Sequence, residues 1–315
     1  MPDVVEAAPA RDRAAASARY GSVAVVGPPN AGKSTLVNRL VGQPVSIVTP
    51  TPQTTRHRII GIVHRPGAQI ALLDTPGFHL PRTPLNRLMI EAIDASLADC
   101  DAAVLLLSAA GKWSPAARLA RPVADLLERL RQANVPTVLG LTKTDLVRPK
   151  ELLLPLMEHA AGVMPFRAVV PISPLTGDGV DDLVGEIVRL MPEGPPHWPD
   201  DDVTDRSLRF LAAERIREAV TLETRQELPH CVAVAIETFE ERRDDARIEA
   251  LVVAHSDAHK RILVGRGGAT IKRIGIRARR LLAETVGRPV HLSLLVKVDD
   301  GWTNDPRKVR ELTGQ

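Results

Sequence analysis

The residues with the clearest chemical meaning form a glycine-rich stretch, residues 27–35, which reads Gly-Pro-Pro-Asn-Ala-Gly-Lys-Ser-Thr. It fits the phosphate-loop pattern G-x-x-x-x-G-K-[ST] at every fixed position. In such a loop the backbone N–H groups surround nucleotide phosphates at the positive end of a helix. We therefore expect Lys33 to reach the β- and γ-phosphates and the hydroxyl oxygen of Ser34 to bind Mg²⁺. The predicted nucleotide contacts in this stretch are Gly27, Asn30, Ala31, Gly32, Lys33, Ser34 and Thr35.

The flanks of this loop place it between a strand and a helix. Residues 23–26 form a short apolar, β-branched run that suits a buried parallel strand, and Leu36, Leu40 and Val41 recur at helical spacing. A glycine-rich turn with a chance lysine is the alternative interpretation. The strand–turn–helix context favours the nucleotide site instead.

Two further motifs follow in the chain, each directly after an apolar run. Asp-Thr-Pro-Gly, residues 74–77, ends one run, and Thr-Lys-Thr-Asp, residues 142–145, ends another. An aspartate at the carboxyl end of a buried strand faces a phosphate loop in an open α/β sheet. The first motif alone is also ordinary turn chemistry, so its meaning depends on following the phosphate loop. Ahead of both, residues 45–56 are rich in proline and threonine, which predicts a mobile loop.

The composition is that of a soluble globular protein with about two domains. Of the 315 residues, 44% are hydrophobic and 25% charged, with a net charge of only +3. The cysteines are Cys100 and Cys231, too few for a disulfide framework or a structural zinc site, so we expect a reducing cytoplasm. No apolar run approaches the ~18 residues of a membrane span. Residues 1–19 are expected to be a disordered extension.

Apolar runs and helical patterns alternate through the first part of the chain, which predicts a mostly parallel sheet covered on both faces. The expected strands are 23–26, 59–63, 70–73, 102–107, 137–141 and 168–170, and the expected helices 84–99, 117–132, 151–161 and 180–190. This α/β domain would span residues 20–191. Residues 192–203 are dense in proline and acid and predict a linker. Residues 204–315 then follow the order α-β-β-α-α-β, a smaller α+β domain.

A second candidate site lies between the two central helices of the C-terminal domain. Residues 265–268 fit the G-x-x-G loop of KH domains, whose backbone clamps single-stranded RNA. A charge run is usually only a solvated face, yet this one borders a glycine turn of phosphate size. The predicted RNA contacts are Lys260, Arg261, Gly265, Arg266, Gly267, Gly268 and Arg273.

The ordered motifs at residues 27–34, 55, 74–77 and 142–145 are similar to those of translation-factor-class GTPases. The stretch 53–58, Gln-Thr-Thr-Arg-His-Arg, together with the C-terminal half, resembles the Era family of bacterial GTPases, over about residues 22–313. This resemblance implies a P-loop GTPase domain followed by a type II KH domain. It also implies a GTP-hydrolysing protein that binds the 3′ end of small-subunit ribosomal RNA and assists assembly of the small ribosomal subunit.

The resemblance also assigns roles to single residues. Thr55 matches the threonine that joins the Mg²⁺ shell and contacts the γ-phosphate, and Gly77 matches the glycine whose N–H senses that phosphate. Asp145 matches the carboxylate that accepts two hydrogens from guanine, a donor pair that adenine lacks. The implied metal ligands are Ser34, Thr55 and Asp74. The implied catalytic residues are Lys33, Thr55 and Gly77. The implied base contacts are Thr142, Lys143, Asp145, Ser173, Pro174 and Leu175.

Two positions depart from the family pattern, and a third feature, Phe78, is shared with the family. The base motif begins with Thr142 where asparagine is usual, and threonine still hydrogen-bonds across the loop. Pro174 has no backbone N–H, so a family contact from that amide to guanine O6 is either lost or supplied by Leu175. Phe78 stands where signalling GTPases carry a water-orienting glutamine, which implies slow intrinsic hydrolysis that awaits a group supplied from elsewhere.

In GTPases with an apolar residue at that position, an asparagine equivalent to Asn30 often helps to hold K⁺. The alternative is that Asn30 is only a good turn residue. For the whole protein, the alternatives are a P-loop enzyme that uses ATP and an RNA tether in which nucleotide is structural. We expect a cytoplasmic monomer that binds the small ribosomal subunit, with peripheral contact at the inner face of the cell membrane left open.

Overall fold

The structure, a computed structural model, describes residues 18–51, 54–80, 84–110, 120–224, 228 and 231–313. Most of the expected N-terminal extension, residues 1–19, lies outside this range. Its last residue, Arg19, already belongs to the first strand. The start of the expected helix 117–132 also lies outside the described residues, and the described helix begins at Arg121.

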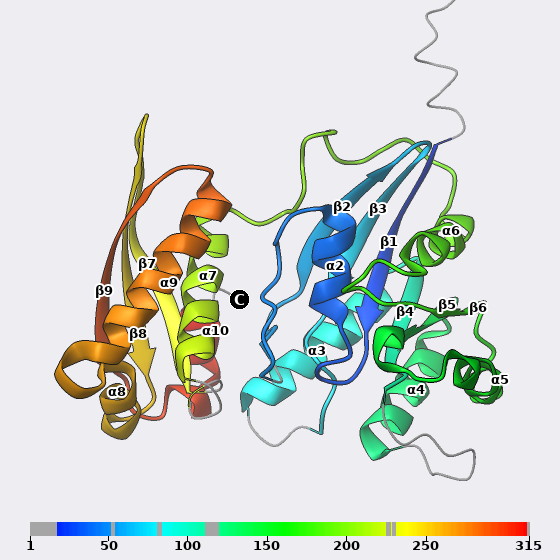
Figure 1. Cartoon of the computed structure of the whole chain (residues 1–315), viewed down its shortest axis with the longest axis horizontal. Coiled ribbons are helices and arrows are strands. Elements are labelled where there is room, and N and C mark those ends of the chain that lie inside the picture. The colour runs from blue at the N-terminus through cyan, green and yellow to red at the C-terminus, as the bar shows by residue number, and fades with distance from the viewer. Residues whose placement is uncertain are drawn as a thin grey trace, which may run out of the picture.

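A six-stranded sheet with the order β2-β3-β1-β4-β5-β6 forms the N-terminal domain (Figure 1). Its strands are β1 (Arg19–Val26), β2 (Ile59–Arg65), β3 (Ala68–Asp74), β4 (Ala102–Ser108), β5 (Thr137–Thr142) and β6 (Ala168–Pro171). Only the edge strand β2 is antiparallel to its neighbour. The inner strands β3, β4 and β5 are almost continuously buried, as expected of parallel strands covered on both faces. The predicted mostly parallel sheet is confirmed.

The described helices of this domain cover the sheet in two layers. One face carries α2 (Lys33–Val41) and α6 (Val180–Leu190), whose apolar residues share a core with β1 and β4. The other face carries α3 (Pro84–Ala98), α4 (Arg121–Ala133) and α5 (Leu153–Ala161), which share a second core with the opposite side of the strands. The carboxyl ends of β1, β3 and β5 therefore meet at one edge of a rigid sheet, where open α/β folds place their ligands.

The C-terminal domain is a three-stranded sheet packed against helices. Its strands β7 (Val232–Glu241), β8 (Ala246–Ala254) and β9 (Val290–Val298) lie in that order, with β8 antiparallel to β7 and parallel to β9. The helices α7 (Leu208–Thr224), α8 (Asp257–Val264) and α9 (Ala269–Val286) share one apolar core with the sheet. This confirms the predicted order α-β-β-α-α-β. The sequence did not predict α10 (Pro306–Thr313), which follows a short 3₁₀ turn at Trp302–Asn304.

The expected linker, residues 192–203, is docked against the first sheet. The buried side chain of Gln69 on β3 accepts hydrogen bonds from the backbone N–H groups of His197 (2.7 Å) and Trp198 (2.8 Å). Its amide also donates to the Trp198 carbonyl at 2.8 Å. Val203 continues this docking, because its carbonyl accepts from the N–H of Ile62 on β2. The polar linker therefore follows the edge of the sheet. The domain limits predicted from the sequence stay predictions.

The two domains meet through the ends of segments that also form the candidate nucleotide site. Arg56 lies just after Thr55 and donates from Nη1 to the Val232 carbonyl of β7 at 2.9 Å. Its guanidinium carbon lies 6.0 Å from the ring centroid of Trp302. Trp302 is fully buried in an apolar cluster, hereafter the Trp302 cluster, made by Leu85, Met89, Ala233, Val253, Trp302 and Val309. Figure 1 shows α7 and α10 on the side of the smaller sheet that faces the larger domain.

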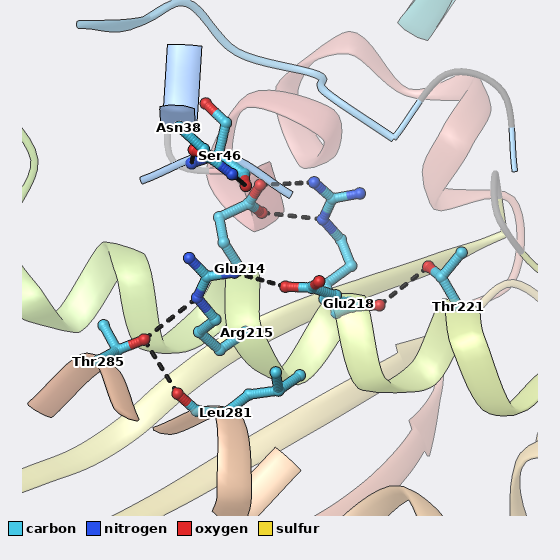
Figure 2. Close-up of polar contacts among 9 residues, drawn as sticks. Asn38, Ser46, Glu214, Arg215, Glu218, Thr221, Leu281 and Thr285 are labelled. Carbon is cyan, nitrogen blue, oxygen red and sulfur yellow. Dashed lines mark hydrogen bonds and ion pairs between the residues drawn. The ribbon is translucent and has the colours of Figure 1, made fainter. Parts of the chain in front are cut away.

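The helix α7 lies between the two domains and is buried on nearly all sides. Its middle turns carry two buried ion pairs, one between Arg217 and Glu214 and one between Arg215 and Glu218 (Figure 2). Arg215 also donates from Nε to the hydroxyl of Thr285 on α9 at 3.1 Å. Charges buried in this way are stabilised only because each has its partner within hydrogen-bond distance. This explains why α7 lacks the polar outer face of a surface helix.

Candidate functional site: a nucleotide cleft and a glycine loop

The phosphate loop connects β1 to α2 in a conformation that requires its glycines. A Cβ atom on Gly27 would lie 2.5 Å from the Leu106 carbonyl oxygen, and Gly32 has a φ of +94°. Lys33 begins α2, and its ammonium donates to the carbonyls of Gly27 (3.1 Å) and Pro28 (3.0 Å). Burial lowers the pKa of Lys33 to about 8, against the opposing attraction of Asp74. These contacts hold a positive charge inside the loop, where phosphates would bind.

The three predicted metal ligands lie together at the edge of this loop. The Ser34 hydroxyl donates to Asp74 Oδ2 at 2.8 Å and lies 3.0 Å from Thr55 Oγ1. Asp74 is fully buried, and this burial raises the pKa of its carboxyl, against the attraction of Lys33. Its Oδ1 has no hydrogen-bond partner among the described residues. Two hydroxyls and one carboxylate suit Mg²⁺, which takes few protein ligands and completes its shell with water and nucleotide phosphates. The residues present therefore fit the ion.

A cleft of about 410 Å³ connects these residues. The predicted site residues that line it are Asn30, Gly32, Lys33, Ser34, Thr35, Thr55, Gly77 and Lys143. Gly77 lies against the phosphate loop, since a Cβ there would be 2.9 Å from Pro29 Cα. The next side chain, Phe78, is buried in the core with the guanidinium of Arg129 over its ring. No water-orienting side chain therefore enters the cleft from position 78.

Among the predicted base residues, Lys143 lines the cleft, and the others lie at or just after the carboxyl ends of β5 and β6. The buried Thr142 hydroxyl donates to the Ala31 carbonyl at 2.8 Å, so threonine does bridge to the phosphate loop. Lys143 has a φ of +60° and turns the chain into a short 3₁₀ helix that contains Asp145. The Ser173 hydroxyl donates to Asp145 Oδ1 at 2.7 Å, which fixes the carboxylate. The roles of these residues toward guanine stay predictions.

The glycine loop of the C-terminal domain lies between α8 and α9. Gly265, Gly267 and Gly268 have φ values of +71°, +56° and +80°. A Cβ on Gly267 would meet nothing within 4 Å, so the middle of the loop is open to the outside. The predicted RNA contacts Lys260, Arg261 and Arg266 are also exposed. A backbone that is exposed and bordered by cations can approach phosphates closely.

The predicted RNA contact Arg273 lies on α9 and is paired with a carboxylate, as is Arg277 one turn later. Arg273 and Arg277 donate to the two carboxylate oxygens of Glu223 on α7, at 3.1 Å and 2.6 Å. The hydrogen bond from Arg277 lowers the pKa of Glu223. Arg273 still lies near the glycine loop, because it also contacts Thr270 in the first turn of α9. Its role in RNA binding stays a prediction, now with a competing carboxylate.

Comparisons with known proteins agree with this architecture. Residues 22–143 match the family described as 50S ribosome-binding GTPase, and residues 227–303 match the KH domain family. The chain is 43% identical over 296 residues to GTPase Era of Nitratidesulfovibrio vulgaris, covering 93% of this chain and 96% of the relative. This chain belongs to the Era family of GTPases. GTPase Era of Stenotrophomonas maltophilia is 42% identical over 90% of this chain and 94% of its own length.

Solved Era structures share the whole fold. A crystal structure of Era in complex with MgGDPNP and nucleotides 1506–1542 of 16S ribosomal RNA is 37% identical, with a TM-score of 0.87. It covers 94% of this chain and 98% of its own. A single-residue variant of Aquifex aeolicus Era bound to GDP·AlF₄⁻ gives the same TM-score and identity, over 93% of this chain and 98% of its own. The Era-family assignment makes the nucleotide GTP or GDP with Mg²⁺ and the reaction GTP hydrolysis, which removes the ATP-using enzyme as an alternative.

Three residues that shape the site were not identified from the sequence. Gln69 anchors the linker, Trp302 joins the domains, and Arg39 of α2 contacts the loop after Ser173. Each acts on a partner that is distant in the chain or on a surface formed only by folding. No local pattern marks them. Among the helices of the described residues, none is long and apolar enough to cross a membrane.

Proposed function

We propose that this Era-family protein hydrolyses GTP in the cleft and binds the single-stranded 3′ end of small-subunit ribosomal RNA through its glycine loop during subunit assembly. The observation that carries the nucleotide half is the contact of one hydroxyl, Ser34 Oγ, with both Asp74 and Thr55. It joins the phosphate loop, the end of β3 and the threonine segment at one point. A glycine turn with a chance lysine would not account for these three groups lying together.

The residues of the cleft divide the chemistry between them. Lys33 and the backbone N–H groups of the loop hold the phosphates, and Lys33 offsets the charge that develops on them. Ser34, Thr55 and Asp74 would hold Mg²⁺, which when bound neutralises charge between the β- and γ-phosphates. Gly77 offers its N–H beside the loop, where a side chain would collide with Pro29. Because Phe78 is in the core, orienting the attacking water is left to a group that another molecule or ion supplies.

Asp145 is proposed to select guanine through the carboxylate that Ser173 holds. The test replaces this acceptor of two hydrogens with an amide, Asp145→Asn, which can donate to the additional carbonyl of xanthine. We expect the variant to lose affinity for GDP and gain affinity for xanthosine diphosphate, measured by equilibrium titration. Unchanged preference for GDP would contradict the assignment of the base site.

For the RNA half, the support is the exposed glycine loop with its exposed cations, and the Era structure in complex with nucleotides 1506–1542 of 16S ribosomal RNA. The test is fluorescence anisotropy of a labelled oligonucleotide of that 3′-end sequence against one with the same bases shuffled. At equal salt the phosphates contribute equally to the binding of both oligonucleotides. We expect the 3′-end sequence to bind more tightly, and that difference would report recognition of its bases. Equal binding would reduce the loop to a non-specific phosphate contact.

We also propose that the protein is a cytoplasmic monomer that binds the small ribosomal subunit. A cytoplasmic monomer is the simplest form that fits two free, unpaired cysteines and two domains that pack on one another within one chain. Sedimentation with isolated small ribosomal subunits would test the partner, and sedimentation with anionic vesicles would test peripheral contact with the inner face of the cell membrane. A protein that hydrolyses no GTP above background would leave only the tether alternative.

A further inference from the structure

The side chain of Arg39 holds the loop that follows Ser173. Arg39 lies on α2, the helix that begins with the phosphate-binding Lys33. Its guanidinium donates to three successive backbone carbonyls, those of Pro174 (3.3 Å), Leu175 (3.2 Å) and Thr176 (2.8 Å). Among the described residues Arg39 has no carboxylate partner, so these carbonyls are its hydrogen-bond acceptors. A planar guanidinium presents its donors in a fixed fork, which suits a fixed row of acceptors.

The loop is shaped to receive this side chain. Gly177 has a φ of +103°, and a Cβ there would lie 2.1 Å from Arg39 Nη2. Any other residue at this position would displace the guanidinium. On its other side, the buried ring of Pro174 approaches the phosphate loop, with its Cγ 3.9 Å from a Cβ built on Gly32. The loop is thus held between the helix and the glycine of the phosphate loop.

The same loop has a single unused amide. Ser173 N–H donates to the Asp178 carbonyl, Thr176 N–H to the Ser173 hydroxyl, and Gly177 N–H to the Ser173 carbonyl. Pro174 has no N–H. Of residues 173–177, only Leu175 retains an N–H with no acceptor among the described residues, and Leu175 is 74% exposed. The unused donor therefore lies two positions from Ser173, the residue that holds Asp145.

We propose that Arg39 is a positioning residue that fixes this loop so that the Leu175 N–H donates to guanine O6, the contact that Pro174 is unable to make. The proposal rests on the assignment of Asp145 to the guanine edge. The residues on both sides of the free amide present their carbonyls to Arg39, which sets the plane of each adjoining peptide. An amide held in this way is preorganised and binds without first paying the entropy of ordering the loop.

The test is a double-mutant cycle in which one change is a substitution in the protein and the other replaces one atom of the ligand. The ligands are GDP and 6-thio-GDP, in which sulfur, a weaker acceptor, replaces O6 while the N1–H and the exocyclic amine that Asp145 would bind are kept. The variants are Arg39→Met, which keeps the apolar stem, and Leu175→Pro, which removes the amide. Arg189→Ala on α6 is the matched control, an exposed arginine whose side chain is 71% accessible and paired with Glu186.

In the parent protein and in Arg189→Ala, we expect GDP to bind about tenfold more tightly than 6-thio-GDP, the size of one good hydrogen bond. In Arg39→Met and in Leu175→Pro this ratio should fall to about one or two. Without a positioned Leu175 amide, neither O6 nor sulfur receives the hydrogen bond that distinguishes the two ligands. Retained binding of 6-thio-GDP also shows that the variants fold.

An equal loss for both ligands in Arg39→Met would overturn the proposal, because a purely structural role weakens them alike. A retained ratio in Leu175→Pro would overturn the assignment of the donor. Both results are separate from the xanthosine test of Asp145, which depends on the N1–H and the C2 substituent of the base and not on O6. A failure of the Arg39 hypothesis can therefore be distinguished from a failure of the Asp145 assignment.

Discussion

At the scale of single residues, the cleft has the groups that bind GTP but no side chain that orients water from position 78. Phe78 packs in the core, and Lys33 places its charge inside the phosphate loop, where its ammonium donates to the Gly27 carbonyl. Asn30 is a further polar side chain of the phosphate loop that lines the cleft. It has a φ of +60° and donates from Nδ2 to the Pro50 carbonyl at 3.1 Å. Both hypotheses for Asn30 therefore remain open, as a turn residue and as a ligand that helps to hold K⁺.

The response of GTP turnover to K⁺ distinguishes the two hypotheses for Asn30. If the Asn30 amide oxygen helps to hold K⁺ near the γ-phosphate, GTP turnover should be several-fold faster in K⁺ than in Na⁺ at equal ionic strength, because such an ion supplies charge there. Asn30→Gly is the informative variant, since glycine keeps the positive φ but has no amide oxygen. Phosphate release in the two salts measures the effect. A variant that keeps the K⁺ stimulation would identify Asn30 as a turn residue only.

At the scale of elements, most of the fold could be predicted because its signals are local. The apolar runs that became β3, β4 and β5 are continuous in the sequence, and the buried residues of α9, among them Ile274, Ala278 and Leu282, recur at helical spacing. The phosphate loop and the predicted metal ligand Asp74 could also be placed, since each lies directly at the end of a strand. Residues that act locally leave a local pattern.

What could not be predicted depends on contacts between distant segments. The linker looks free in sequence because it is rich in proline, and only the folded sheet offers Gln69 as its anchor. The helix α10 is short and polar, and it is held by the Trp302 cluster, to which α3 of the other domain contributes. Arg39 carries no signal because its acceptors are backbone carbonyls of any residue type.

The glycine loop between α8 and α9 gives a prediction at this scale. Gly267→Asp adds a negative charge where a Cβ meets nothing in the protein, at a φ of +56° that aspartate adopts more readily than most residues, so the cost to the fold is small while RNA phosphate is repelled. We expect a loss of at least ~1–3 kcal/mol in affinity for the 3′-end oligonucleotide, by analogy with other nucleic-acid contacts. GTP binding should persist, which separates the two sites. Anisotropy titration measures the loss.

Gly267→Asn is the matched control, because it has the same shape and the same tolerance of positive φ without the charge. The difference in RNA affinity between the two variants should decrease as the salt concentration rises, since salt screens the repulsion between the aspartate and RNA phosphate. Unchanged RNA affinity in Gly267→Asp would contradict the KH assignment of this loop.

At the scale of the whole molecule, the segment after Thr55 is buried in the other domain. His57 is 5% exposed and lies edge-on to Phe210 of α7, with ring centroids 5.8 Å apart. Burial lowers the pKa of His57 to about 4; Glu214 opposes this, and Arg217, Arg56 and Arg206 add to it. The native state therefore binds fewer protons than the unfolded state between about pH 6.5 and pH 4, and stability falls as the pH falls through this window.

The acid-induced loss from this one group is on the order of 3 kcal/mol once the pH is below 4. His57→Gln has no such proton to bind. We expect the melting temperature of the parent to fall more than that of the variant between pH 7 and pH 5, by differential scanning calorimetry. Parallel pH profiles would show that His57 does not set acid stability.

The Trp302 cluster gives the last prediction, because it receives contacts from both sides of the nucleotide cleft. Arg56 follows Thr55, a predicted metal ligand, and lies over Trp302, while Leu85 and Met89 belong to α3, which begins shortly after Gly77. If nucleotide binding alters either segment, Trp302 carries the change to β7, β8 and α10. We therefore expect the parent to show different RNA affinities with GDP and with the non-hydrolysable GTP analogue GDPNP, and by reciprocity RNA to change the ratio of their affinities by the same factor.

Trp302→Phe, which keeps an apolar ring but leaves a smaller contact, should move that ratio toward one with little effect on GTP affinity, and Trp302→Ala should do so further at a stability cost of about 3–5 kcal/mol. Trp198→Ala is the matched control, because this tryptophan lies on the linker outside the cluster. Anisotropy titrations of the 3′-end oligonucleotide in the two nucleotides measure the ratio. If Trp302→Phe and Trp302→Ala both keep the parental ratio, nucleotide state reaches the RNA loop by another route, and the cluster only holds the domains together.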